Sequence, residues 1–163
     1  MTTESIRVVA DSPARTGTVA AAVAGHLRAG DVVLLHGELA AGKTTFVTAA
    51  AAALGSPDPV TSPTFMLAQF YGGGRVPVLH VDTYRLTGVA EFRDLGLEEQ
   101  LAESATLVEW GGLVATELPE HLAVTLTADP GDEQRRTITI SAHGARWAGV
   151  PEAIETGLLA EAA

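Results

Sequence analysis

Short apolar runs alternate with longer stretches of helical periodicity in the first part of the chain. The runs Ile6–Ala10 and Val32–Leu35 have the length and composition of strands. Between them, Ser12 followed by Pro13 predicts a helix start, because serine caps the free N–H groups of the first turn and proline suits its first position. The apolar stripe that follows carries this helix to about Leu27.

A second helix is expected after the Val32–Leu35 strand, over an alanine-rich run that reaches about Leu54. Gly55 then provides a C-terminal stop, and Pro57 and Pro59 prevent continuation because proline lacks the backbone N–H. The small side chains of this helix suit close packing on a sheet.

The middle of the chain adds two strands, a broken helix and a further strand. Phe65–Tyr71 and Val76–Val81 are separated by a short glycine-rich turn, so we expect them to pair antiparallel. Glu91–Ser104 is expected to be mostly helical with an interruption near Gly96, and Thr106–Trp110 to be a short buried strand.

The last third predicts a hairpin of alternating residues followed by a terminal helix. The hairpin turns at Asp129–Asp132, and the helix is expected over Trp147–Ala163. No internal repeat or low-complexity linker interrupts the chain. We therefore expect a single domain over residues 1–163.

Composition narrows the class of protein. Hydrophobic residues make up 47% of the 163 positions, which is typical of a globular chain. A formal net charge of −10 argues against a large surface for nucleic-acid backbone or anionic membrane, so we expect no tight direct binding of nucleic acid and no membrane association. The absence of cysteine and of a signal-like start leads us to expect a cytoplasmic protein.

The segment Gly37–Thr44 fits the pattern G-x-x-x-x-G-K-[ST] and lies between a predicted strand and a predicted helix. In such a loop, backbone N–H groups and the positive end of the helix hold phosphates, Lys43 reaches the outer phosphates, and the Thr44 hydroxyl ligates magnesium. Lys43 is the only lysine of the chain. We expect ATP or ADP with Mg²⁺ as cofactors, held by Ala40, Ala41, Gly42, Lys43, Thr44 and Thr45. The predicted fold is an α/β, P-loop NTPase-like three-layer sandwich with a mixed central sheet.

Two carboxylates follow strands on the expected loop edge and are the candidate catalytic residues. Glu109 ends a buried strand, where we expect it to hold magnesium through water or to activate water; it could instead cap a helix. Asp82 could orient the attacking water or hold magnesium through water, or simply form a turn. The sequence does not divide the two roles between them.

Other residues have weaker signals. His80 is expected to pack and hydrogen-bond inside the sheet, and Trp110 to belong to the core more than to a nucleotide-binding wall. Thr64 is either a switch threonine or a strand entry. Tyr84 and Arg85 are candidate contacts for a partner or phosphate, and Ser12, Arg135 and Arg136 are candidates for the adenine pocket.

Four motifs in this order and spacing closely resemble the TsaE family, also called YjeE: G-E-L-A-A-G-K-T-T-F (Gly37–Phe46), V-T-S-P-T-F (Val60–Phe65), H-V-D-T-Y-R-L (His80–Leu86) and L-V-E-W-G (Leu107–Gly111). The resemblance implies a small P-loop ATPase, weak alone and dependent on partners. It would assist the TsaB–TsaD complex in making the threonylcarbamoyl modification of the adenosine next to the tRNA anticodon. In that family the ATPase is not the transferase.

The chain departs from the family pattern at one loop position, where such proteins usually have glycine and this chain has Ala40. If that residue adopts a positive φ, alanine costs about 1 kcal/mol. Either the angle is negative here, or nucleotide binding is weaker than usual.

Other classes of P-loop protein require sequence features that can be checked in this chain. A GTPase of the N-K-x-D type is excluded because the chain has no asparagine. A small-molecule P-loop kinase needs a lid with several basic residues, and the arginines after the loop are few and scattered. The kinase, and a nucleotide-binding module without turnover, stay open as alternatives.

Overall fold

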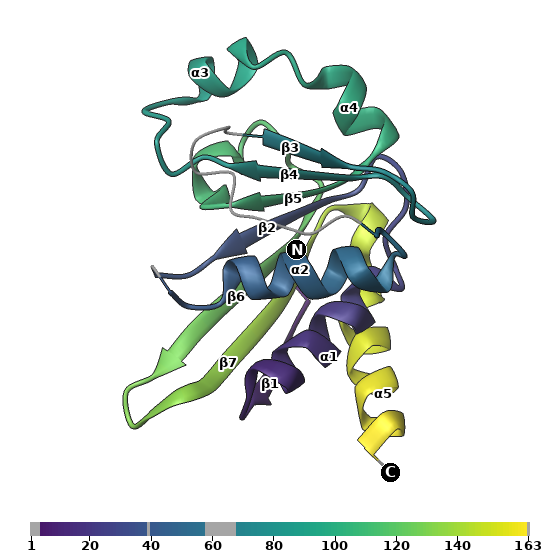
Figure 1. Cartoon of the computed structure of the whole chain (residues 1–163), viewed down its shortest axis with the longest axis vertical. Coiled ribbons are helices and arrows are strands. Elements are labelled where there is room, and N and C mark those ends of the chain that lie inside the picture. Colours follow the sequence, from purple (N-terminus) through teal and green to yellow (C-terminus); the bar gives the residue numbers. More distant parts are fainter. Residues whose placement is uncertain (1–3, 39, 58–67, 163) are drawn as a thin grey trace.

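The computed structural model describes residues 4–38, 40–57 and 68–162. Its strands form one seven-stranded sheet in the order β1-β7-β6-β2-β5-β4-β3 (Figure 1). The strands are β1 Ser5–Ala10, β2 Val32–His36, β3 Ala68–Tyr71, β4 Val78–Asp82, β5 Ala105–Glu109, β6 His121–Asp129 and β7 Asp132–His143. The helices are α1 Pro13–Ala24, α2 Lys43–Ala53, α3 Val89–Asp94, α4 Glu98–Glu103 and α5 Val150–Ala162, with 3₁₀ turns η1 Gly111–Val114 and η2 Ala145–Trp147.

The sheet is mixed, as the sequence predicted. Its central strands β6, β2, β5 and β4 run parallel to one another, and β3 pairs antiparallel with β4. On the other side, the hairpin strands β6 and β7 pair antiparallel and β1 adds to β7. The parallel centre places the carboxyl ends of β2, β4 and β5 at one edge.

Helices cover both faces of the central strands, which gives three layers. Helices α1, α2 and α5 pack on one face through a large apolar cluster that includes Val33, Leu35, Phe46 and Trp147. A smaller cluster around Phe92 and Val114 joins α3 and η1 to the opposite face. Figure 1 shows α1, α2 and α5 together beside β6 and β7, while α3 and α4 lie beyond β3 and β4. The α/β three-layer prediction is confirmed.

The first helix begins where its capping residues predicted. Ser12 has an extended backbone (φ −155°), and its hydroxyl accepts a hydrogen bond of 3.1 Å from the Arg15 N–H. The helix ends at Ala24, earlier than the expected Leu27, because the chain tightens there into i−3 hydrogen bonds. Leu27 is nevertheless 1% exposed, so the buried apolar stripe continues beyond the end of the helix.

Other boundaries differ in small ways that have local causes. β4 begins at Val78, since the preceding Pro77 has no N–H for a strand ladder. The predicted terminal helix divides into η2 and α5. The first residues of the predicted strand Phe65–Tyr71 lie outside the described residues, as does the whole motif Val60–Phe65. Within the described ranges, no helix is long and apolar enough to cross a lipid bilayer.

Candidate nucleotide-binding site

Three parallel strands bring the two candidate carboxylates to the loop. Glu109, the last residue of β5, is paired in register with Leu35 of β2 on one side and with Asp82 of β4 on the other. The loop that follows β2 therefore starts beside both carboxylates, at the carboxyl edge of the parallel strands. The predicted position of Glu109, beside the strand that precedes the loop, is confirmed.

Glycines give the loop its shape at both ends. Gly37 has φ +150°, and a Cβ there would lie 2.7 Å from the Leu126 carbonyl oxygen, so only glycine fits. Gly42 has φ +105° at the N-cap of α2. Ala40 has φ +65°, so the angle is positive and the first of the two alternatives raised by this residue is wrong. The loop has an alanine in a conformation that normally favours glycine.

The first turn of α2 is open to an anion. Among the described residues no side chain caps this helix, which begins at Lys43 immediately after Gly42. The N–H groups of the first turn have no partner inside a helix, and they carry its positive dipole end. This arrangement suits phosphate, and it includes the backbone of Thr44 and Thr45.

The Lys43 side chain folds back over its own loop. Its Nζ donates hydrogen bonds to the carbonyl oxygens of Gly37 (2.7 Å) and Glu38 (2.8 Å), and it lies 4.1 Å from the ring centroid of Trp110. Lys43 is 5% exposed, and this burial lowers the pKa of its ammonium group, while the carboxylates of Glu109 and Asp82 oppose the change. These contacts hold the ammonium group at the loop.

Glu109 is the centre of the polar contacts. The Thr44 hydroxyl lies 3.2 Å from each of its carboxylate oxygens, and His80 Nε2 lies 2.6 Å from Oε2. Glu109 and His80 are both buried. A carboxylate and a threonine hydroxyl in contact are the hard oxygen donors that Mg²⁺ prefers. The alternative of Glu109 as a helix cap has no support in these contacts.

The Asp82 side chain, at the end of β4, accepts a hydrogen bond from the backbone of the turn that follows. Its Oδ1 accepts a hydrogen bond of 2.9 Å from the Tyr84 N–H. Burial raises the pKa of the Asp82 carboxyl, and the charge of Glu109 adds to the increase, whereas the Tyr84 N–H, His80 and Lys43 act in the opposite direction. Asp82 thus has both the turn-forming contact and the proximity to Lys43 and Glu109.

Trp110 lines the cavity beside the phosphate-binding loop. It has φ +62°, and the Thr83 hydroxyl donates to its carbonyl oxygen at 2.7 Å. Its ring lies 4.9 Å from that of Tyr84, which is 61% exposed. The ring is half-buried and lines a cavity, so the expectation that Trp110 belongs to the core is wrong. The left-handed turn after β5 directs the ring out of the sheet.

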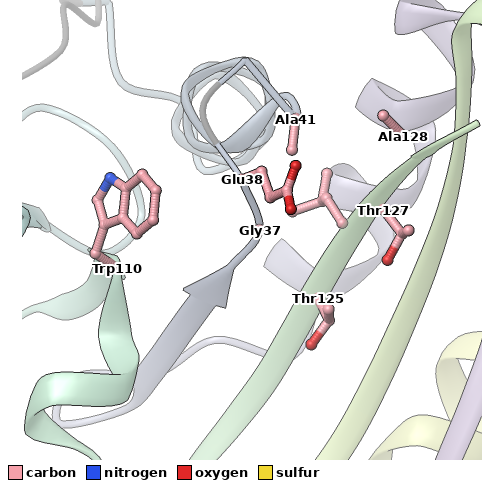
Figure 2. A pocket seen from close by; sticks show the side chains of 8 residues that line it. Gly37, Glu38, Ala41, Trp110, Thr125, Thr127 and Ala128 are labelled. Atoms are coloured by element: carbon pink, nitrogen blue, oxygen red, sulfur yellow. The ribbon is translucent and has the colours of Figure 1, made fainter. Parts of the chain in front are cut away.

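A cavity of about 660 Å³ lies beside the loop. Figure 2 shows Trp110 on one side of this cavity and Thr125 and Thr127 of β6 on the other, with Glu38 and Ala41 of the loop between them. A cavity of this size is in the range of small-molecule binding sites.

Arg136 of β7 donates hydrogen bonds to the backbone of the loop. Its Nε donates to the Ala41 carbonyl oxygen at 2.8 Å, and its Nη2 to that of Ala40 at 3.3 Å. A smaller cavity of about 80 Å³ lies there, lined by Pro13, Thr16, Ala41, Gly42, Thr45, Glu133, Gln134 and Arg136. The start of α1 and the hairpin, both proposed for the adenine, therefore do border the loop. Which of them meets the base stays a prediction.

The prediction that His80 packs and hydrogen-bonds inside the sheet is confirmed. The sequence did not identify Glu109 as its partner, or Arg136 as a contact of the loop. His80 carried a signal: it lies two residues before Asp82, so both side chains face the same side of β4 as Glu109 does on β5. Arg136 lies 95 residues from Ala41, and nothing local to either residue indicates the contact. Thr64 lies outside the described residues.

The residues present fit a magnesium nucleotide. Within the described part of the chain, no group of three or more His, Asp or Glu side chains forms a metal cage. Magnesium in nucleotide enzymes is held by one or two protein oxygens together with the phosphates, so such a cage is not needed. Thr44 and Glu109 are the protein groups suited to this role.

Comparisons with known proteins identify the family of the chain. The family model for the threonylcarbamoyl adenosine biosynthesis protein TsaE matches residues 10–138. The tRNA threonylcarbamoyladenosine biosynthesis protein TsaE of Streptomyces coelicolor is 41% identical over 80% of this chain and 93% of its own length. The protein of the same name from Bacillus subtilis is 38% identical over 83% and 85%. The crystal structure of Bacillus subtilis YdiB superposes with a TM-score of 0.79 at 31% identity, covering 96% of this chain and 98% of that one. The chain belongs to the TsaE family.

Proposed function

We propose that this protein binds and hydrolyses ATP as an accessory factor in the threonylcarbamoyladenosine modification of tRNA. In this role it acts on the TsaB–TsaD complex. The observation that carries the proposal is the contact of the Thr44 hydroxyl with the Glu109 carboxylate, beside a lysine and an uncapped helix start. Family membership supports the tRNA-modification role, since its relatives are named for that pathway.

Each group has a part in this proposal. The first-turn N–H groups of α2 and the ammonium group of Lys43 hold the phosphates, and Thr44 and Glu109 hold magnesium, directly or through water. Bound magnesium neutralises charge on the phosphate oxygens. Asp82 lies next to Glu109 in the sheet, and we assign to it the orientation of the attacking water. The raised pKa of Asp82 is compatible with a carboxyl that accepts a proton during the reaction.

The kinase alternative loses support from the positions of the arginines. Arg75 donates to the carbonyl oxygens of Ala24 and Leu27, and Arg146 pairs with Asp31 at 2.7 Å. Arg93 pairs with a glutamate near η1. Arg136 contacts the loop itself, but these three side chains are engaged elsewhere in the fold. They do not form the basic lid that a phosphoryl-transferring kinase needs.

Phosphate release tests the proposal. We expect slow ATP hydrolysis by the isolated protein and stimulation when TsaB and TsaD are added with Mg²⁺. A nucleotide-dependent complex should form in a pull-down, and tRNA binding should be negligible at physiological salt because the chain is acidic. Lys43→Ala provides the control with weakened nucleotide binding.

Three outcomes would separate the alternatives. ATP binding without turnover, even with both partners present, would favour a nucleotide-binding module. Failure of any complex to form under all nucleotide conditions would refute the partner assignment and favour the kinase. Tight tRNA binding by the isolated chain would also contradict the proposal.

A further inference from the structure

His80 is a fully buried polar residue in contact with the candidate magnesium ligand. It lies on β4, opposite Leu107 of β5, and its side chain is 0% exposed. Its Nε2 lies 2.6 Å from Glu109 Oε2, the shortest of the polar contacts that Glu109 makes among the described residues. The ring of Tyr71 lies on another side, with 6.4 Å between the ring centroids.

The hydrogen-bond partners of His80 specify which nitrogen carries the proton. Nδ1 is buried and has no hydrogen-bond partner in the described part of the chain. An imidazole with its proton on Nε2 donates to Glu109 and leaves only an unpaired acceptor at Nδ1. The other neutral form would leave a buried N–H without a partner and set a lone pair against the carboxylate. The contact is therefore an N–H donated to Oε2.

A purely structural role does not explain a histidine at this position. The neighbours on the same side of the sheet include Tyr71, Val78 and Leu107, all members of the large apolar cluster. An apolar residue of similar volume would pack among them without burying an unpaired nitrogen. The benefit of histidine lies in its contact with Glu109.

The carboxylate of Glu109 has few other restraints. Thr44 contacts both oxygens at the longer distance of 3.2 Å, and the Thr44 hydroxyl is itself a candidate magnesium ligand. If that hydroxyl turns toward a metal ion, His80 becomes the remaining described side chain that restrains the carboxylate. Partners of this kind commonly orient metal-binding groups from behind.

We propose that His80 is a positioning residue for Glu109: its Nε2–H holds Oε2 so that the carboxylate faces the Thr44 hydroxyl and the magnesium nucleotide. This inference rests on the proposed function, because it assumes that Glu109 serves magnesium or water. His80 itself touches neither phosphate nor metal. It acts through Glu109.

Two substitutions separate positioning from packing. His80→Leu keeps an apolar volume and removes the donor, whereas His80→Gln places an amide N–H at a similar reach. We expect His80→Leu to lower ATP turnover roughly 10- to 100-fold, as is usual for the loss of such a partner. It should also reduce the gain in ADP affinity on adding Mg²⁺, while magnesium-free ADP affinity stays unchanged. His80→Gln should recover most of both effects, and His143→Leu, at the far end of the sheet, should change neither.

The outcomes that overturn the inference are distinct from those that overturn the function. Wild-type turnover and an unchanged magnesium effect in His80→Leu would refute the positioning role, as would equal losses of ADP affinity with and without Mg²⁺. If the wild-type protein does not hydrolyse ATP, the proposed function fails, and the magnesium effect on ADP binding still tests His80. If His80→Leu does not fold, ¹⁵N spectra of the wild-type imidazole decide: a proton on Nε2 supports the inference, and one on Nδ1 contradicts it.

Discussion

The Thr44 hydroxyl lies 3.2 Å from both carboxylate oxygens of Glu109, a residue 65 positions away in the chain. Thr44 is placed by the first turn of α2, and Glu109 by the last position of β5. Their contact joins the phosphate-binding loop to the neighbouring strand. It defines the point at which we propose that magnesium binds.

Removing the charge of either acid should affect turnover far more than ground-state binding. Glu109 and Asp82 are assigned to metal and water, and phosphate binding is assigned to the loop. We therefore expect Glu109→Gln and Asp82→Asn to reduce ATP turnover by at least roughly 100-fold, in the range of lost general acid–base catalysis. Magnesium-free ADP affinity, measured by calorimetry, should change little. Glu103→Gln, at the exposed end of α4, is the matched control. Parallel losses of turnover and magnesium-free affinity would refute the assignment.

Replacing Ala40 by glycine should relieve strain in the loop. Its φ of +65° costs an alanine about 1 kcal/mol, and glycine adopts this angle without that cost. If the free protein relaxes the strain by opening the loop, Ala40→Gly should bind Mg·ADP up to about fivefold more tightly.

Ala41→Gly provides the comparison for this prediction. Ala41 is 2% exposed and does not have a positive φ, so glycine there removes packing without relieving strain. No gain in affinity is expected for it. An affinity of Ala40→Gly equal to or below that of the wild type would show that the strain does not limit binding.

The stability of the protein should fall as the pH decreases below about 6.5, in part through His121. This side chain is 6% exposed and stacks on His143 with 4.5 Å between ring centroids. Burial lowers the pKa of His121 below its ordinary value of 6.5, and His143 lowers it further, although the hydrogen bond to the Leu118 carbonyl opposes both. As the pH falls, the imidazole is therefore protonated in the unfolded chain before it is protonated in the folded protein. The contribution of His121 to stability is fully present above about pH 6.5 and is lost as the pH falls through the folded pKa.

His121→Asn tests this dependence, because asparagine keeps a donor near Nδ1 and does not titrate. The slope of melting temperature against pH should be shallower in the variant than in the wild type. It should not vanish, since burial also lowers the pKa values of His26 and His36. Identical slopes would exclude His121 as a source of the pH dependence.

The sequence predicted those parts of the fold and site whose causes are local. Ser12 starts a helix through its side-chain hydroxyl and Pro13 through its fixed ring, and Gly37 and Gly42 shape a loop because only glycine tolerates their angles and contacts. The place of Glu109 beside the loop also followed, because a short buried strand ending on an acid is a regular feature of this fold.

The remaining features depend on register and on distant parts of the chain. His80 meets Glu109 only because β4 and β5 align Asp82 with Glu109. Trp110 was expected in the core as a large aromatic residue, but a single left-handed backbone angle turns it toward the cavity. The contact of Arg136 with the loop requires the whole hairpin to fold back beside β2. Apart from the alternation that puts His80 and Asp82 on one face of β4, these relationships have no signature within a short stretch of sequence.

Calorimetric titration of ADP with Mg²⁺ into the wild-type protein and into Lys43→Ala tests most directly whether the loop is a nucleotide site. A charge-assisted phosphate contact contributes about 1.5–3 kcal/mol, so the variant should bind one to two orders of magnitude more weakly, with a melting temperature close to that of the wild type. Equal affinity in the two proteins, or no binding by the folded wild type, would contradict the account.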